Sequence, residues 1–294
     1  MTAEILAQGL MEALTPSRTA QGAAMHRAAH QLLDTPPLFV DPLAVRIIGP
    51  EAERELRGGT DWHARDRAGG LRAFIAMRSR FAEDGLSSAV ARGIRQYVLL
   101  GAGLDTFAYR AGDDFSGVTI FEIDHPATQA WKRARLEEFA IPIPSNVIYA
   151  PVNFESETLG EGLARAGFDF SRPAFFAWLG VTPYLSRNAV METLKFIASS
   201  MPEGSEIMFD YAQPVGALDA SQRANFEAMA ERVAAAGEPF KSFFEPDTLV
   251  RDLRALGFSS VEDFDASALN PRYFANRADG LKLRGRAHVL KARV

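Results

Sequence analysis

The chain contains no cysteine and only 5 histidines among its 294 residues. Without cysteine there are no disulfides, thiolate metal sites, iron–sulfur clusters or cysteine nucleophiles. Long hydrophobic runs are also missing, because the longest clean one, residues 174–179 followed by Gly180 and Val181, is far too short to span a bilayer. These absences exclude a disulfide-stapled scaffold, a thiolate centre and a helical membrane protein.

An excess of basic residues is absent as well. Lys and Arg number 32 against 37 Asp and Glu, which gives a formal net charge of −5 with His neutral. A mild acidic excess offers no electrostatic footprint for nucleic acid or for an anionic membrane. The N-terminus carries Glu4 and Glu12 and lacks a basic lead, so we expect no secretory signal. The expectation is a cytoplasmic protein whose partner is a small molecule.

The hydrophobic pattern changes period near residue 96. Residues 1–92 show helical spacing with no convincing strand, whereas short apolar runs alternate with helical patterns over residues 93–294. The runs lie at residues 97–100, 118–121, 147–149, 175–178 and 207–209, with a last one at 287–290. This alternation predicts an α/β fold with a doubly wound, mostly parallel sheet, the last strand being antiparallel at its edge. No repeat or linker divides the chain, so one domain over residues 1–294 is expected, with residues 1–92 as a helical cap.

Several helix boundaries carry recognisable signals: a capping side chain, a proline in the first turn or a glycine beyond the end. They are Ser17 before a helix to Leu33, Pro126 with Asp124 close before it, Thr158 with Glu161 as a capping box, and Gly257 after residues 246–256. An apolar stripe of Leu6, Leu10 and Leu14 indicates a further helix near the N-terminus. The helices therefore alternate with the expected strands.

Two strand ends suggest a nucleoside site, since ligands of open α/β sheets bind beyond the carboxyl ends of the strands. Gly101 and Gly103 follow the first strand and allow close backbone approach, although a plain turn is the alternative. Thr106 replaces the third small residue of a dinucleotide fingerprint and Asp105 would repel a pyrophosphate, so NAD and FAD are disfavoured. Asp124, 21 residues beyond Gly103, is placed either to accept from ribose hydroxyls or to cap a helix.

Two further strand ends carry polar groups. Asn153 and Phe154 follow the third strand, where an amide and a backbone N–H can contact an adenine edge or simply form a turn. Thr182 and Tyr184 follow the fourth strand and Gly180, and they bring hydroxyl groups to the same edge of the sheet. Tyr184 packing within a loop is the alternative.

Six sequence segments, taken together and in order, resemble one family. They are SRTA at 17–20, FVDP at 39–42, RSRF at 78–81, LLGAGLDT at 99–106, FEIDHP at 121–126 and GVTPYL at 180–185. The chain resembles the leucine carboxyl methyltransferase family from about residue 17 to residue 258. Members are class I S-adenosylmethionine-dependent O-methyltransferases with a Rossmann-like fold, and the bacterial members that look most similar are often linked to secondary metabolism.

The resemblance implies a set of cofactor-binding residues. They are Arg78 for the methionyl carboxylate, Gly101, Ala102, Gly103 and Asp105 in the cofactor loop, Asp124 and His125 at the ribose, Asn153 and Phe154 at the adenine, and Leu179 on the fourth strand. Three positions depart from the family pattern: Asn153 replaces the usual Asp, Leu179 a frequent Glu, and Phe107 a common Arg. Asn153 can still accept a hydrogen bond through its amide oxygen, whereas Leu179 removes a carboxylate from the cofactor site.

The acceptor side is less defined. Arg18, Thr182 and Tyr184 are the substrate-side candidates, and a carboxylate acceptor is favoured over a phenol because it is ionised at pH 7 and needs no base. His125, the only histidine at an expected strand end, suits the nucleoside edge as well as a base role, so no catalytic base is assigned. The alternatives are an NAD(P)-dependent oxidoreductase and a catalytically inactive methyltransferase fold that acts as a binding protein.

Other conspicuous residues are interpreted structurally. His26 and His30 share a helix face but lack a third ligand, so no metal site is expected. The basic run at residues 132–135 is interpreted as a solvated helix face, and residues 272–274 as a surface loop.

Overall fold

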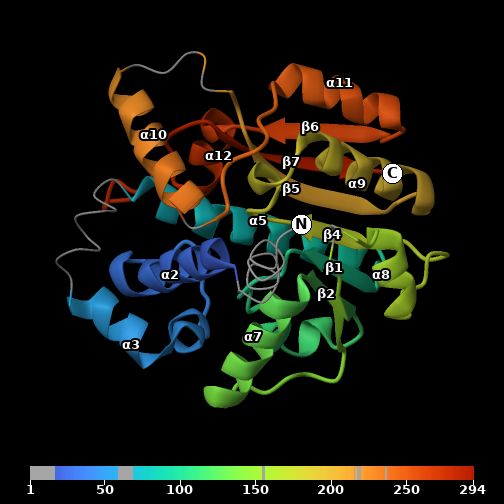
Figure 1. The fold of residues 1–294 in the computed structure, drawn as a ribbon, viewed down its shortest axis with the longest axis horizontal. Coiled ribbons are helices and arrows are strands. Elements are labelled where there is room, and N and C mark those ends of the chain that lie inside the picture. Colours follow the sequence, from blue (N-terminus) through green and yellow to red (C-terminus); the bar gives the residue numbers. More distant parts are fainter. Residues whose placement is uncertain (1–16, 59–68, 154–155, 215, 217–219, 236) are drawn as a thin grey trace, which may run out of the picture.

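The computed structural model describes residues 17–58, 69–153, 156–214, 216, 220–235 and 237–294. Its centre is a seven-stranded sheet in the order β3-β2-β1-β4-β5-β7-β6 (Figure 1). The strands are β1 (Gln96–Leu100), β2 (Thr119–Asp124), β3 (Val147–Pro151), β4 (Phe175–Trp178), β5 (Glu206–Ala212), β6 (Ser260–Phe264) and β7 (Ala287–Arg293). Strands β1 to β5 pair in parallel, and β7 is antiparallel to both β5 and β6. As expected, β1 lies between β2 and β4, where the strand order reverses.

Helices precede the sheet and alternate with its strands. They are α2 (Arg18–Leu33), α3 (Ala44–Gly58), α5 (Gly70–Ala91), α6 (Phe107–Arg110), α7 (Pro126–Glu138), α8 (Leu159–Arg165), α9 (Arg187–Ser200), α10 (Ala220–Ala235), α11 (Pro246–Leu256) and α12 (Ala266–Tyr273), with the short 3₁₀ turns η1 (Asp113–Phe115) and η2 (Thr182–Tyr184). Helix α2 packs against α3 and α5, and these elements lie together in Figure 1. Among the described residues, no helix combines the length and the apolar character needed to cross a membrane.

The predicted helix boundaries are found where the sequence signals lie. The Ser17 hydroxyl accepts from the Ala20 N–H and begins α2. Thr158 and Glu161 form the expected capping box at the start of α8. Gly257 ends α11 with φ of +109°, a conformation that glycine adopts at little cost. The leucine stripe at Leu6, Leu10 and Leu14 lies outside the described residues.

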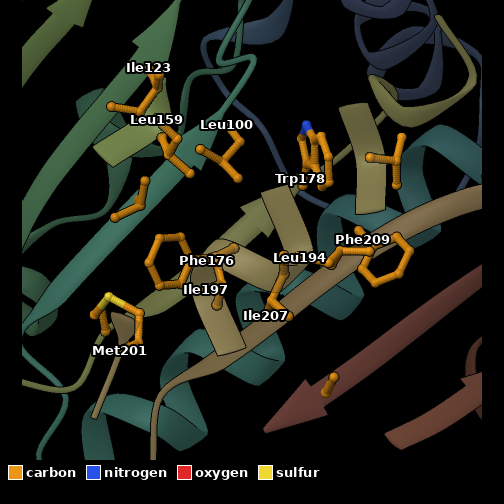
Figure 2. Packing of buried hydrophobic residues seen from close by; sticks show 14 of the residues in the cluster. Leu100, Ile123, Leu159, Phe176, Trp178, Leu194, Ile197, Met201, Ile207 and Phe209 are labelled. Carbon is orange, nitrogen blue, oxygen red and sulfur yellow. The ribbon is translucent and has the colours of Figure 1, made fainter. Parts of the chain in front are cut away.

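Alternate strand residues pack to opposite faces of the sheet, and both faces are covered. On one face, strand residues meet side chains of α8 and α9, as Figure 2 shows. The residues labelled there are Leu100, Ile123, Leu159, Phe176, Trp178, Leu194, Ile197, Met201, Ile207 and Phe209. On the other face, Tyr97, Leu99 and Phe175 belong to a cluster with Met77 and Phe81 of α5. Burial on both faces explains the continuous apolar runs of the central strands β1 and β4.

The strand at the C-terminus was wrongly expected at the sheet edge. Strand β7 is antiparallel as predicted, but β6 pairs with its outer side and forms the edge. Strand β6 lacks an apolar run because only Val261 and Phe264 are apolar, with Glu262 and Asp263 between them. The sequence pattern therefore could not distinguish it from a loop.

The basic run at residues 132–135 is solvated only at Arg133 and Ala134, so the prediction is wrong for Lys132 and Arg135. The Lys132 ammonium is buried and lies 2.8 Å from Glu122 Oε1. Arg135 donates to the carbonyl oxygens of Ile47 and Ile48, beside a kink of α3 at Gly49. The guanidinium group therefore binds carbonyls next to the interruption of the α3 helix, and both basic side chains join α7 to neighbouring elements.

Residues 272–274 were also expected in a loop, but Arg272 and Tyr273 belong to the end of α12 and Phe274 is its C-cap. The Tyr273 ring packs edge-on against Phe81, and its hydroxyl donates to Asp84. His30 has a structural environment: its Nδ1 lies 2.6 Å from Asp34 Oδ2, and its Nε2 accepts from the Leu38 and Phe39 N–H groups. Among the described residues, no cluster of His, Asp and Glu side chains is arranged to hold a metal ion.

Candidate active site

A cavity of about 2570 Å³ lies at the carboxyl ends of the parallel strands. Its walls come from the loops that follow β1, β2, β3, β4 and β5, from α2 and α5, and from the segments that lead into α11 and β7. This is the edge at which open α/β sheets bind their ligands. The switch point between β1 and β4 divides it into a half over β1 to β3 and a half over β4, β5 and β7.

The loop after β1 and the end of β2 are joined by a direct hydrogen bond. The Gly103 N–H donates to Asp124 Oδ2 at 2.5 Å, and the His125 N–H donates to Asp124 Oδ1 at 2.7 Å. Burial raises the pKa of Asp124, although these two N–H groups act in the opposite direction. Each carboxylate oxygen has a second lone pair. Asp124 lines the cavity and can therefore accept from hydroxyl groups of a ligand.

Both loop glycines have left-handed backbone angles and closely approaching neighbours. Gly101 has φ of +67°, and a Cβ there would lie 2.4 Å from Val181 Cγ2. Gly103 has φ of +46°, and a Cβ there would lie 3.0 Å from the Ala20 Cβ of α2. Side chains at these positions would be strained and crowded. The loop thus needs glycine for its own shape, beyond any need of a ligand.

His125, rather than Asp124, caps helix α7. Its Nδ1 accepts from the Ala127 N–H at 3.3 Å, and Pro126 occupies the first helical position. The capping alternative for Asp124 is therefore wrong, and its carboxylate binds the β1 loop instead. His125 also lines the cavity on the side of Asp124.

Asp105 has a structural function within the loop. Its carboxylate lies 3.3 Å from Arg27 Nη1 and accepts from the Phe107 N–H at 2.7 Å. Burial alone would raise the pKa of Asp105, but the charges of Arg27, Lys132 and Arg110 outweigh it and lower the pKa. Arg27 also donates to the Leu104 carbonyl at 2.5 Å, so α2 is fastened to the loop that follows β1.

Arg78 reaches the cavity from α5 and is fixed by Asp210 at the end of β5. Arg78 Nη1 lies 2.9 Å from Asp210 Oδ2, while Asp210 Oδ1 accepts from the Gly180 N–H at 2.5 Å. The guanidinium lies so close to Gly180 that a Cβ there would be 2.4 Å from Arg78 Nη2. Asp210 followed an expected strand but had no predicted role, because its partner Arg78 lies 132 positions away.

The other predicted contacts differ in position. Asn153 and Leu179 line the cavity after β3 and β4, and Phe154 lies outside the described residues. Thr182 does not face the cavity: it is fully buried and its hydroxyl donates to the Asp210 carbonyl at 2.6 Å. Its expected contact with substrate is therefore contradicted, because the side chain holds η2 against β5.

Arg18 and Tyr184 both line the cavity. Arg18 is the first residue of α2 and is exposed. Tyr184 stacks on Phe240 with ring centroids 5.5 Å apart, and burial raises its pKa to about 12. Tyr184 is therefore a neutral hydrogen-bond donor at physiological pH.

Sequence reasoning missed an aromatic cluster over the β4 and β5 half of the cavity. Phe240 stacks on Phe226 of α10 at 5.9 Å, and Phe243 meets both rings edge-on. All three line the cavity beside Tyr184. No strand-end pattern marks these residues, since they come from α10 and the loop before α11. The same is true of Arg286, which lines the cavity from the residue before β7.

Comparison with known proteins places the chain in a family. Residues 20–198 match the leucine carboxyl methyltransferase family. The "Putative S-adenosyl-L-methionine-dependent methyltransferase YktD" of Bacillus subtilis (strain 168) is 29% identical over 299 residues, which cover 94% of this chain and 97% of that protein. A protein of the same description from Mycobacterium sp. (strain JLS) is 30% identical over 230 residues, covering 75% of this chain and 71% of that protein.

The fold also matches solved structures. A DUF574 family protein from Streptomyces avermitilis has a TM-score of 0.57 at 14% identity, with 95% of this chain and 97% of that chain covered. The chain therefore belongs to the leucine carboxyl methyltransferase family. This confirms the resemblance carried by the six sequence segments and assigns the chain to the methyltransferases rather than to the oxidoreductases.

Proposed function

We propose that this protein transfers the methyl group of S-adenosylmethionine to a carboxylate oxygen of a small-molecule acid. The observation that carries the proposal is the joint position of the β1 glycine loop, Asp124 and Arg78 at one edge of the sheet. Relatives of this chain are named as users of the same methyl donor. Their names and the family support methyl transfer, and the acceptor is argued from chemistry.

The residues of the β1 to β3 half fit the nucleoside part of the donor. Asp124 accepts from the ribose hydroxyls through its remaining lone pairs. The glycines at 101 and 103 keep side chains away from the backbone beside it, and Ala102 adds only a methyl group. Asn153 reaches the adenine from the end of β3, and Leu179 contributes an apolar contact. The assignments of the glycines and Asp124 follow the family pattern, Asn153 and Leu179 depart from it, and all of these residues line the cavity.

Arg78 fits the methionyl carboxylate. Asp210 accepts from Nη1 of the guanidinium, and the group lies close against Gly180. A guanidinium has five N–H donors, so donors remain for a second carboxylate. Arg78 and Asp124 thus take the two polar ends of the donor.

Methyl transfer to a carboxylate balances without a proton. One acceptor oxygen forms a bond to the methyl carbon while the sulfur–carbon bond breaks and its electron pair stays on sulfur. Bound S-adenosylmethionine supplies the electrophilic methyl group and a neutral thioether leaving group. The chain therefore has to align the two reactants and exclude water, which is a matter of proximity and orientation.

The absence of an assigned base agrees with this chemistry. The Nδ1 of His125 is engaged by the Ala127 N–H, and the raised pKa of Tyr184, about 12, keeps its hydroxyl protonated. A phenol or alcohol acceptor would need a group that takes up its proton. A carboxylate is already ionised at pH 7. We place the acceptor among small metabolites, as the resemblance to bacterial secondary-metabolism enzymes suggests.

The test is the fate of a labelled methyl group. The protein is incubated with methyl-labelled S-adenosylmethionine and a panel of small acids and phenols, and the products are treated with mild base. A carboxyl methyl ester releases labelled methanol, which is the expected result. Label that survives mild base would refute the carboxylate assignment, and no transfer to any compound would refute the proposed function for that panel.

A further inference from the structure

The half of the cavity over β5 and β7 holds a cation without a counter-charge. Arg286 Nε donates to Gln213 Oε1 at 3.4 Å, and its Nη1 is buried without any hydrogen-bond partner. Within the described ranges, neither Arg286 nor its neighbour Arg284 forms an ion pair, although both line the cavity. A buried guanidinium nitrogen with no acceptor is costly unless a ligand supplies one.

A chain of hydrogen bonds holds this cation in place. Gln213, which directly follows β5, places its amide nitrogen 2.7 Å from His288 Nε2. His288 Nδ1 lies 2.7 Å from Asp263 Oδ2, and Tyr211 donates to the other oxygen of Asp263. With Nδ1 donating to Asp263, His288 Nε2 accepts from the Gln213 amide. This orientation turns the amide oxygen of Gln213 toward Arg286.

The charges nearby leave the cation uncompensated. Asp210, the carboxylate at the end of β5, is already occupied by Arg78 and the Gly180 N–H. Asp263 is occupied by His288 and Tyr211. Asp210 and Asp263 are thus both paired, and only Asp210 of the two lines the cavity. Glu238, which also lines the cavity, is held by the Thr19 N–H at the start of α2. The β5 and β7 end therefore keeps Arg286 as a cation that can bind an anion.

The aromatic cluster adjoins the same position. The Ala212 carbonyl accepts from the Phe244 N–H at 3.0 Å, and the Gln213 N–H donates to the Arg286 carbonyl at 3.1 Å. Successive residues at the end of β5 therefore bind the loop that carries Phe240 and Phe243 on one side and the Arg286 segment on the other. Partly exposed rings next to a cation form a surface for an apolar body with an anionic group.

We propose that Arg286 anchors the carboxylate of the methyl acceptor, and that the acceptor is an acid with an aromatic or similarly bulky apolar body packed on Phe226, Phe240 and Phe243. This inference rests on the proposed methyl transfer and names its substrate class. It assigns acceptor recognition to Arg286 instead of Arg18. Arg18 is exposed at the start of α2, where solvent screens its charge.

The experiment measures binding and turnover separately. Calorimetry on the complex with S-adenosylhomocysteine uses 3-phenylpropionate, indole-3-acetate and octanoate as probes, with 3-phenylpropanol as the uncharged counterpart. We expect at least one acid to bind and the alcohol to bind about tenfold or more weakly. Arg286→Gln should weaken binding of that acid by about tenfold to a hundredfold, since it removes a charged hydrogen bond. Arg286→Lys should fall between the two, because an ammonium lacks the planar fork.

Two controls distinguish a failure of the Arg286 assignment from misfolding of a variant and from a failure of the proposed function. Lys282→Gln removes a cation from the same segment outside the cavity and should bind acids like the wild type. Affinity for S-adenosylhomocysteine should remain unchanged in every variant. Failure to bind S-adenosylhomocysteine would defeat the proposed function itself. If S-adenosylhomocysteine binds, three results would overturn the Arg286 assignment. They are that no acid binds, that an acid binds equally to the wild type and to Arg286→Gln, or that only Arg18→Gln loses affinity for the acid.

Discussion

Gly180 offers a sharp test of the Arg78 site. It follows β4 with φ of +73°, and a Cβ there would lie 2.4 Å from Arg78 Nη2 and 2.8 Å from both Cζ and Nη1. Gly180→Ala therefore displaces the guanidinium from its plane. The displacement breaks the 2.9 Å contact between Arg78 Nη1 and Asp210 Oδ2. The substitution thus acts on Arg78 without changing any charged residue.

Two free-energy effects follow. A left-handed alanine costs about 1–2 kcal/mol of stability. Loss of the proposed charged hydrogen bond between Arg78 and the methionyl carboxylate should cost about 1.5–3 kcal/mol of binding, or about tenfold to a hundredfold in Kd. Calorimetry with S-adenosylhomocysteine should show this loss. Binding of adenosine, which lacks the methionyl carboxylate, should change little.

Gly167→Ala is the matched control. Gly167 has φ of +76°, and a Cβ there would meet nothing within 4 Å. This variant carries the same backbone strain and should lose similar stability from that source, yet bind S-adenosylhomocysteine like the wild type. If Gly180→Ala also binds it normally, Arg78 does not hold the methionyl carboxylate as we reason.

Three further variants test other parts of the structure. Asp124→Asn should weaken S-adenosylhomocysteine binding about tenfold or more. Burial raises the pKa of Asp124 above 3.8, so the wild-type affinity should begin to fall at a higher pH than it would with an exposed aspartate. The affinity of the variant should lack this pH dependence. Equal pH profiles would contradict the ribose role. Lys132→Met should lower the free energy of unfolding by about 3–5 kcal/mol in denaturant titrations, because it leaves Glu122 buried without its cation, and adding Glu122→Gln should restore part of it. A negligible loss of unfolding free energy would show that Glu122 is not ionised. The third variant concerns Asp34. Burial would raise the pKa of Asp34, but hydrogen bonds from His30 and Arg72 lower it below 3.8. Ionised Asp34 therefore stabilises the folded state fully above pH 3.8, and this stabilisation is lost as the pH falls through the lower pKa of the folded state. The difference in unfolding free energy between wild type and Asp34→Asn should shrink in that acid range, and a constant difference would contradict the reasoning.

The parallel half of the fold is predictable because strands that are buried on both faces consist of continuous apolar residues, which can be recognised in the sequence. Strands β1 and β4 are apolar at every position except Gln96, and β5 contains the apolar run at residues 207–209. The helix caps at Ser17 and Thr158 depend on short-range hydrogen bonds. Strand β6 has one buried residue, Val261, between two exposed ones, and therefore leaves a weaker sequence pattern. Its pairing with β7, which moves β7 away from the edge, depends on long-range contacts that no local pattern specifies.

The charged residues show the same limit. Lys132 belongs to a basic run that resembles a solvated helix face, yet its ammonium is buried against Glu122. The distinction depends on a carboxylate in another element, 10 positions away in the sequence. Thr182 likewise lies in a motif at the right strand end but turns its hydroxyl inward to Asp210.

The two halves of the site differ in how far the sequence could predict them. The cofactor half lies at consecutive strand ends, so Gly101, Gly103 and Asp124 could be related by spacing alone. The acceptor half is assembled from α10, the loop before α11 and the residue before β7. Phe240 and Arg286 have no recognisable spacing, and only the antiparallel pairing of β5 with β7 brings their segments together.

The central claim is that S-adenosylmethionine lies across the β1 loop and the end of β2. A crystal structure with S-adenosylhomocysteine tests it most directly. We expect both ribose hydroxyls to donate to the Asp124 carboxylate, the methionyl carboxylate to pair with Arg78, and the sulfur to face the half of the cavity over β4 and β5. A ligand bound elsewhere, or one whose ribose lies away from Asp124, would contradict the account.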